Sequence, residues 1–238
     1  MPQTPKLESV SYQDGDVVLT GWLARPVGTP RGAVLIWPTI ANVGPAIEAR
    51  ATALAEQGYI ALIGDFYGAP VASFEASFPM AAELRGDWEQ YRARLRAALT
   101  ALRAVPGVDG LKIAVIGYCM GGQAALELAR DGADIAAAVS FHGVFSTEKP
   151  AQPGAVKARI LVLHGDADPL APRDAVIGLW QELDTAGANW HFHAYANVRH
   201  GFTDPESDAR GKDFLGYNTS ADRQSWAAML SFFDEIFA

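Results

Sequence analysis

The stretch VIGYCMGGQAA (residues 115–125) decides the fold of this chain. It overlaps the apolar segment KIAVIGY (112–118), which is typical of a buried strand, and residues 120–131 are typical of a helix. Between them, GYCMG (117–121) has the form of the nucleophile elbow Gly-x-Ser-x-Gly, with cysteine in place of serine. The turn is sharp, and a Cβ at either flanking glycine would collide with the neighbouring strand or helix. We therefore expect a strand–turn–helix unit with Cys119 at its apex.

Cys119 is the only cysteine of the chain, and it is either a buried core thiol or a nucleophile. Free cysteines are commonly buried and inert. At an elbow, however, the thiol lies at the positive N-terminal end of a helix. This dipole, together with a nearby histidine, lowers the pKa of a thiol and raises its thiolate fraction. The motif favours a nucleophile, provided that acid and histidine partners exist.

Two further segments supply such partners. LVLHGDADPLAP (161–172) is an apolar strand that runs into two aspartates, and HFHAYANVRHGF (191–202) is a strand followed by a loop with His200. The order nucleophile, acid, histidine, with each at a strand's C-terminal end, is that of α/β-hydrolases. Asp168 is favoured as the acid, since Asp166 is nearer the strand end and suits a turn or a hydrogen-bond acceptor. We expect the acid to orient the imidazole, which deprotonates the thiol and later activates water.

An oxyanion formed at this site needs two backbone donors. One is the N–H of Met120, directly after the nucleophile, and the other comes from the loop after the strand GAVLIWP (32–38). Counting into that loop, we expect the Ile40 N–H to be the second donor. Removing one such donor typically costs roughly 10²–10³ in rate.

The remaining histidines call for other interpretations. His191 and His193 alternate with aromatic residues and share one strand face, but no third ligand is evident, so we expect no metal. His164 ends a strand and is expected to be structural. His142, in SFHGVF (140–145), either lines the pocket or belongs to the core.

Along the chain, strand and helix patterns alternate, which predicts an α/β fold with a mostly parallel central sheet and helices on both faces. We expect one domain over residues 1–238, with residues 67–87 as a loop that covers the pocket. Gly86 either breaks the first turn of the long helix or marks its start. Strands are expected at 7–13, 16–25, 32–38, 59–66, 112–118, 135–141, 158–165 and 189–195, and helices at 44–58, 81–105, 120–131, 173–186 and 222–236.

Composition excludes several classes of function. The formal net charge of −8 disfavours nucleic-acid binding, which needs clustered Lys and Arg. No apolar run reaches the roughly 20 residues of a membrane span, and residues 1–16 contain no apolar segment typical of a signal peptide. One cysteine allows neither an internal disulfide nor a cysteine-based zinc site. We expect a cytoplasmic protein, monomeric or homodimeric, whose partner is a small molecule.

Four segments together look like dienelactone hydrolases, and the resemblance covers nearly the whole chain. They are QGYIALIGDFYG (57–68), GYCMGG (117–122), GDADPLAP (165–172) and RHGF (199–202). The resemblance implies an α/β-hydrolase fold and a Cys119–Asp168–His200 triad without a cofactor. It also implies a carboxylic ester hydrolase that cleaves an ester or lactone through a thioester-linked acyl-enzyme.

The chain departs from this family where the substrate is held. The family's glutamate before the oxyanion-hole residue corresponds to Thr39, and Glu48, the nearest carboxylate, is expected on the surface. Of two family arginines that hold a substrate carboxylate, one corresponds to Asp204 and the other only loosely to Arg85. An acidic residue at the mouth disfavours an anionic ligand, so a neutral ester or lactone is expected.

The candidate substrate pocket comprises Thr39, Arg85, Trp88, Tyr118, His142, Phe202 and Asp204. Phe74, Phe78, Met80 and Trp88 either form an apolar wall or pack a helix onto the sheet. Three functions stay open: the ester or lactone hydrolase, a non-catalytic ligand-binding or redox-sensing protein on the same fold, and an acyltransferase or thioesterase. The fold alone does not separate them.

Overall fold

The computed structural model describes residues 7–238, and its eight strands form one hydrogen-bonded sheet in the order β1-β2-β4-β3-β5-β6-β7-β8. This confirms the α/β fold. The strands are β1 (Glu8–Asp14), β2 (Val17–Ala24), β3 (Gly32–Trp37), β4 (Tyr59–Ile63), β5 (Ile113–Tyr118), β6 (Ala137–Phe141), β7 (Arg159–Gly165) and β8 (Trp190–Tyr195). The helices are α1 (Pro45–Glu56), α2 (Phe74–Arg85), α3 (Trp88–Ala104), α4 (Met120–Arg130), α5 (Arg173–Thr185) and α6 (Thr219–Ile236), with a short 3₁₀ helix at Asp208–Arg210.

The chain divides into two compact units, whose border lies within β5, between Val115 and Ile116. Each unit is described by itself, and the single domain expected from the sequence stays a prediction. No helix of the described part of the chain combines the length and the apolar character needed to cross a membrane. The absence of a signal peptide was inferred from residues 1–16, of which the first six lie outside the described residues.

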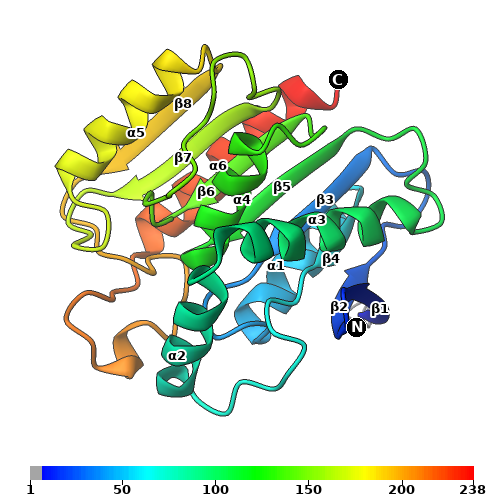
Figure 1. The fold of residues 1–238 in the computed structure, drawn as a ribbon, viewed down its shortest axis with the longest axis horizontal. Helices are drawn as coiled ribbons and strands as arrows, with labels where there is room; N and C mark the ends of the chain where they lie inside the picture. The colour runs from blue at the N-terminus through cyan, green and yellow to red at the C-terminus, as the bar shows by residue number, and fades with distance from the viewer. Residues whose placement is uncertain (1–6) are drawn as a thin grey trace. The chain divides into compact units, whose positions relative to one another are not determined.

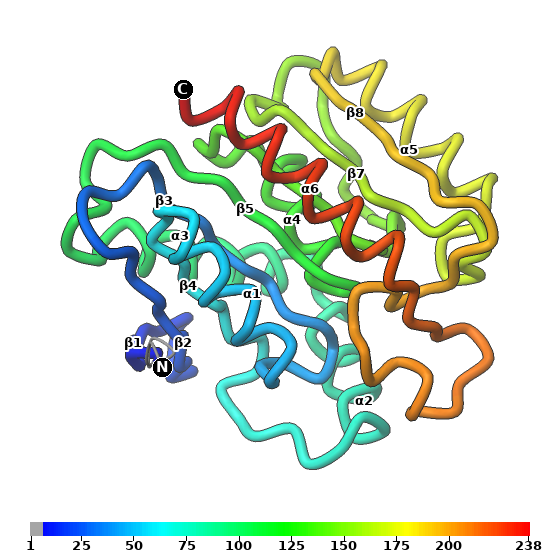
Figure 2. The backbone as a smooth tube through the Cα atoms, turned by 180° about the vertical axis from the view of Figure 1, so that it is seen from behind, coloured from blue at the N-terminus to red at the C-terminus, as the bar shows by residue number. Residues whose placement is uncertain are grey.

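In the first unit, helices lie on both sides of the strands. β1 and β2 form an antiparallel hairpin, β2 pairs antiparallel with β4, and β3 pairs parallel with β4. α1 packs against β4 and β2, whereas α3 packs against β1 and β3 on the opposite side (Figures 1 and 2). Every residue of β3 and β4 is buried, as expected for parallel strands covered on both faces.

Residues 67–87 correct the sequence-based expectation of a loop. Residues 74–85 form the helix α2, which is separated at Gly86 from α3, so the long helix expected at 81–105 is two helices. Asp87 starts α3 anew after Gly86, because its Oδ1 accepts from the N–H groups of the first turn of α3, while Ser73 Oγ caps the start of α2 by accepting from the Ala76 N–H. Pro79 lies inside α2. Because proline usually breaks a helix, the sequence pattern did not predict this one.

In the second unit, β6, β7 and β8 form parallel pairs. α4 packs against β6, and α6 packs against β6 and β7 from the other side, so that α4 lies in front in Figure 1 and α6 in front in Figure 2. The Trp180 ring on α5 stacks on Trp190 of β8 at 5.9 Å, and His191 of the same strand faces Phe232 of α6 at 6.1 Å. Alternate residues of β8 thus face opposite layers, as the sequence pattern predicts.

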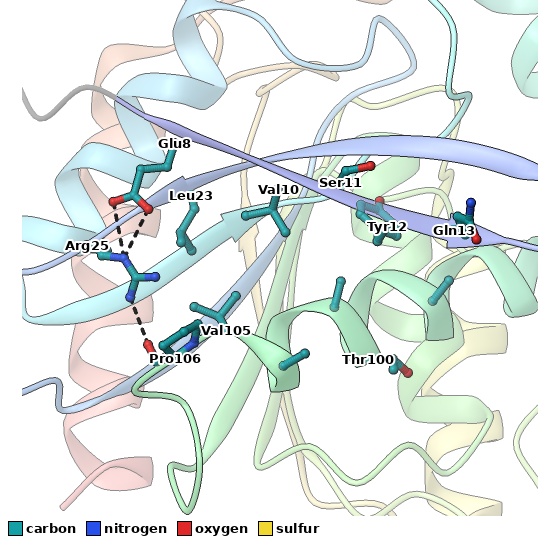
Figure 3. Close-up of a pocket in the computed structure, with 13 residues that line it drawn as sticks. Glu8, Val10, Ser11, Tyr12, Gln13, Leu23, Arg25, Thr100, Val105 and Pro106 are labelled. Atoms are coloured by element: carbon teal, nitrogen blue, oxygen red, sulfur yellow. Dashed lines mark hydrogen bonds and ion pairs between the residues drawn. The ribbon is translucent and has the colours of Figure 1, made fainter.

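A groove of about 540 Å³ lies between the β1–β2 hairpin and α3 (Figure 3). Its walls are formed largely by apolar side chains, among them Leu23 and Val105. At one end, Arg25 pairs with Glu8, at an Nε–Oε1 distance of 3.3 Å, and donates to the Pro106 carbonyl at 3.0 Å. No candidate site residue lines this groove.

Candidate active site

Cys119 occupies a strained turn at the start of α4. It is the N-cap residue, with φ 59° and ψ −118°, a conformation that a residue with a side chain rarely adopts. Such strain costs of order 1–3 kcal/mol and persists only where the surroundings enforce it. A Cβ on Gly117 would collide with the carbonyl of Gly121, and one on Gly122 would lie 2.6 Å from Ser140 Oγ. The glycines around Cys119 are therefore required by close backbone packing.

Two acceptors hold the backbone of this turn. The Cys119 N–H donates both to the Phe141 carbonyl and to Nδ1 of His142, each at 3.1 Å. The thiol itself is partly exposed. The elbow thus leaves the thiol partly exposed, while two hydrogen bonds fix the backbone that carries it.

The loops after β7 and β8 bring an acid and a histidine together. Asp168 Oδ2 lies 2.6 Å from His200 Nδ1, and both side chains are at most 1% exposed. The other carboxylate oxygen of Asp168 accepts from the Leu170 N–H at 2.8 Å, which fixes its orientation. Asp166 instead pairs with Arg173 on the surface. Of the two aspartates in the motif, the structure places Asp168 against the histidine.

The thiol acts on the His200 imidazole electrostatically. Burial by itself lowers the pKa of His200, but attraction to Cys119 and hydrogen bonds to Asp168 and Cys119 raise it to about 10. The Nε2 atom has no oxygen or nitrogen partner among the described residues. Catalytic hydrogen bonds are often long before substrate binds and tighten only in the complex. The arrangement favours a thiolate–imidazolium pair at neutral pH.

Replacing Cys119 with alanine is expected to lower the pKa of His200 from about 10. The substitution removes the attraction and the hydrogen bond of the thiolate, while burial still lowers the pKa and only Asp168 still raises it. An NMR titration of the His200 ring measures the change, with the exposed His191 and His193 as internal controls. An unchanged His200 titration in the variant would show that the thiol does not act on this imidazole.

Comparison with known proteins identifies the family. Residues 19–237 match the model of the dienelactone hydrolase family. The chain belongs to the dienelactone hydrolase family. This confirms the resemblance seen in the sequence, and it makes the protein a hydrolase.

Three relatives illustrate the range of this family. The protein K02A2.1 of Caenorhabditis elegans is 36% identical over 149 residues, which are 62% of this chain and 94% of that protein. A probable 2-oxo-3-(5-oxofuran-2-ylidene)propanoate lactonase of Bradyrhizobium sp is 28% identical over 201 residues, 79% of this chain and 80% of its own length. The crystal structure of a dienelactone hydrolase-like promiscuous phosphotriesterase, P91, from metagenomic libraries superposes with a TM-score of 0.94 at 34% identity, covering 99% of this chain and all of that one.

Among the candidate pocket residues of the second unit, Tyr118 and Phe202 are buried. Tyr118 stacks on Phe141 at 4.7 Å, and Phe202 packs edge-on against His142 at 5.2 Å. Both side chains therefore belong to the buried packing of the second unit of this dienelactone hydrolase family member. His142 is 1% exposed and lies directly beneath the Cys119 backbone.

The sequence-based prediction was that an acidic Asp204 disfavours an anionic ligand, and the structure shows a cation beside this acid. Its side chain is 12% exposed and pairs with Arg210, at an Oδ2–Nη1 distance of 2.6 Å, and its carboxylate also accepts from the Glu206 N–H. The negative charge is therefore compensated. Sequence reasoning missed Arg210 because a partner six residues away in an irregular loop follows no pattern.

In the first unit, the loop after β3 is held by side chains. Thr39 Oγ1 accepts from the Ala41 N–H at 3.2 Å, and the Tyr67 hydroxyl donates to the Ile40 carbonyl at 2.9 Å. The Asn42 amide donates to Asp65 Oδ1 at 2.8 Å. Asp65 is a structural residue of this loop that sequence reasoning missed, although its place at the end of β4 was visible. The role of the Ile40 N–H as an oxyanion donor stays a prediction.

The remaining candidates of the first unit lie on α2 and α3. Arg85 is partly buried, and its Nε donates to the Ala81 carbonyl of its own helix at 3.2 Å. Trp88 packs edge-on against Tyr91 at 5.9 Å. Phe74 and Phe78 form an edge-on pair at 5.1 Å, with Phe78 exposed. The position of Glu48 on the exposed side of α1 agrees with the surface role expected for it.

Proposed function

We propose that this protein hydrolyses a neutral carboxylic ester or lactone, with Cys119 as nucleophile, His200 as general base and acid, and Asp168 as the group that orients His200. The observation that carries the proposal is the buried Asp168–His200 pair beside a thiol on a strained elbow. The family of the chain supports the same reaction class.

In the proposed first half-reaction, the Cys119 thiolate attacks the carbonyl carbon. The oxyanion accepts hydrogen bonds from the N–H groups of Met120 and Ile40. The tetrahedral intermediate collapses, the bond to the alkoxy oxygen breaks, and the His200 imidazolium gives its proton to the departing alkoxide. A thioester on Cys119 and a neutral imidazole remain.

In the second half-reaction, His200 takes a proton from a water molecule, whose oxygen attacks the thioester carbonyl. Collapse of this intermediate releases the carboxylic acid and restores the thiolate–imidazolium pair. Asp168 keeps Nδ1–H directed toward itself throughout, so that Nε2 faces the reacting atoms. The buried carboxylate also stabilises the positive charge of the imidazolium.

A neutral substrate is proposed because the cations at the family's carboxylate-binding positions are absent or engaged. Position 204 is an aspartate paired with Arg210, and Arg85 donates to its own helix. The Bradyrhizobium relative is described as the lactonase of a propanoate, which is an anionic lactone, so the neutral substrate is proposed for this chain from its own residues.

The test is to follow hydrolysis of p-nitrophenyl butyrate and of a dienelactone, and to look for a covalent adduct by mass spectrometry. We expect turnover of the neutral ester and, after rapid acid quenching, a butyryl mass on the peptide that contains Cys119. The Cys119→Ala variant is expected to lose both signals while remaining folded. Turnover of the dienelactone as well would point to a cation that replaces the family arginines.

Other outcomes favour the alternative functions. No turnover of any ester, with a folded protein, would favour a ligand-binding or redox-sensing role. Faster product formation with added alcohols, or a preference for acyl-thioesters, would indicate an acyltransferase or thioesterase. A p-nitrophenyl phosphotriester belongs in the panel, because the relative of 34% identity is described as a promiscuous phosphotriesterase.

A further inference from the structure

His142 lies between two parts of the proposed site, the elbow that carries Cys119 and the loop that carries His200. It follows β6 directly, is 1% exposed, and has a positive φ of 38°. Its own N–H donates to the Leu163 carbonyl of β7 at 2.8 Å, which anchors its backbone. The ring packs edge-on against the His200 ring at a centroid distance of 5.1 Å. A buried imidazole needs hydrogen-bond partners for its ring nitrogens. Each nitrogen of His142 has one.

The two ring nitrogens of His142 contact different parts of the site. Nδ1 accepts from the Cys119 N–H at 3.1 Å. Nε2 lies 2.9 Å from Oγ1 of Thr203, which is buried three residues after His200 on the same loop. The imidazole therefore connects the backbone of the nucleophile elbow to the loop that carries the general base.

The hydrogen-bond network determines which nitrogen of His142 carries the proton. A proton on Nδ1 would point at the Cys119 N–H, so that two donors would face each other across 3.1 Å. Nδ1 must therefore be an acceptor, and the ring proton is on Nε2, where Thr203 Oγ1 accepts it. A second proton would also place a cation 5.1 Å from the imidazolium of His200. Two more titratable residues lie near the ring: Tyr118 at the end of β5, with ring centroids 6.0 Å apart, and Cys119 at the elbow.

We propose that His142, as a neutral imidazole protonated on Nε2, is a positioning residue that ties the Cys119 elbow to the Thr203 loop and so holds the thiol in register with His200. The inference rests on the proposed function of Cys119 and His200. The strained backbone at Cys119 gives the physical need for it, because such a turn persists only where neighbouring groups enforce it. His142 touches neither the thiol nor the substrate in this role, and it acts through the Cys119 backbone.

The protonation state has a direct spectroscopic test. A long-range ¹H–¹⁵N correlation spectrum at pH 7.5 is expected to show a neutral His142 ring with its proton on Nε2, beside a doubly protonated His200 ring. The His142→Asn variant assigns the resonances. A His142 ring that is protonated on Nδ1 would overturn the proposal. Since this measurement needs no turnover, its result is independent of whether esters are substrates.

Variants at both ends of the link test the positioning role. Thr203→Val removes the hydroxyl at nearly constant volume, and Thr203→Ser retains it. We expect Thr203→Val to lower kcat for p-nitrophenyl butyrate by about fivefold to tenfold at unchanged KM, the loss of one neutral hydrogen bond, with Thr203→Ser within about twofold of wild type. The rate of Cys119 alkylation by iodoacetamide is expected to fall in parallel.

At the ring itself, His142→Phe removes both hydrogen bonds, and His142→Asn retains an acceptor in place of Nδ1. The expected order of kcat is wild type, then His142→Asn, then His142→Phe, with the last lower by about tenfold to a hundredfold. His164→Phe is the matched control: it removes another buried histidine, at the end of the adjacent strand β7, whose ring has no hydrogen-bond partner among the described residues. It is expected to lower kcat far less than His142→Phe, because His164 acts on Asp168 and His200 only through its charge and its ring makes no hydrogen bond to the elbow.

The outcomes separate the possible explanations. If Thr203→Val and His142→Asn fold and match wild type in kcat and alkylation rate, the positioning role is wrong. If they change only the free energy of unfolding, His142 is structural and the proposal is again wrong. If wild type turns over no ester and Cys119→Ala changes nothing, the proposed function has failed instead, and the NMR and alkylation results still decide the role of His142.

Discussion

In the Asp168→Asn variant, kcat/KM for p-nitrophenyl butyrate is expected to fall by about 10⁴-fold, as it does when the acid of a Ser-His-Asp triad becomes an amide. Asp168 Oδ2 lies 2.6 Å from His200 Nδ1 in a site that excludes water, so the full negative charge stabilises the imidazolium. An amide keeps the shape but loses the charge, and its NH₂ group favours the wrong tautomer of His200. The variant also removes two of the effects that raise the pKa of His200, so the imidazolium is less stable than in the wild type.

The neighbouring aspartate provides the control for this substitution. Asp166 lies two residues earlier in the same motif, but its carboxylate is exposed and binds Arg173. We expect Asp166→Asn to change kcat/KM by no more than a few fold, while circular dichroism shows both variants folded. A large loss in Asp166→Asn together with a small one in Asp168→Asn would transfer the role of the acid to Asp166.

The largest expected effect on stability concerns Arg130 of α4. Its guanidinium is 2% exposed, binds both carboxylate oxygens of Glu182 on α5 and one of Glu127, each at 2.8 Å, and donates to the Phe145 carbonyl at 2.9 Å. Arg130→Met leaves two carboxylates without their cation, and breaking a buried pair in this way typically costs about 3–5 kcal/mol. The expected fall in Tm is about 6–20 °C for a chain of this size. Urea unfolding followed by two spectroscopic probes measures it.

A surface pair of the same geometry is the control for Arg130. Arg173 binds both carboxylate oxygens of Asp166 in the same two-bond arrangement, but its side chain is 78% exposed. Arg173→Met is therefore expected to leave the free energy of unfolding nearly unchanged, because water and salt screen exposed pairs. Replacing Glu127, Arg130 and Glu182 together with apolar residues is expected to recover most of the lost stability. A small effect of Arg130→Met would show that the buried carboxylates become protonated or hydrated at little cost.

Several features of the candidate site are predictable because they depend on residues that are adjacent in the chain. The elbow needs a strand, glycines beside Cys119 and a helix, all within residues 112–131, and each part has a recognisable pattern. Asp168 and His200 follow the ends of β7 and β8, and parallel neighbouring strands end at the same edge of a sheet. That geometry brings the two residues together without further information.

Other features resisted prediction for identifiable reasons. The helix α2 contains Pro79, a strong helix breaker, which outweighs the capping signal of Ser73 in the sequence pattern. Asp204 is predicted from the sequence as an acid that disfavours anionic ligands, but Arg210, in the 3₁₀ helix Asp208–Arg210, compensates its charge. His142 has no motif at all, because its partner Thr203 lies 61 residues away in the sequence.

The sequence by itself determined the alternation of strands and helices, the family, and the cysteine, acid and histidine that the proposed chemistry uses. These follow from local periodicity, turn chemistry and motif spacing, which are properties of neighbouring residues. Only the tertiary structure decided which atom of His142 carries its proton, and that Arg130 and Glu182, 52 residues apart, form a buried ion pair. Hydrogen bonds and ion pairs depend on distances of a few ångströms in space. The number of residues between two groups along the chain does not tell how close they are in the fold.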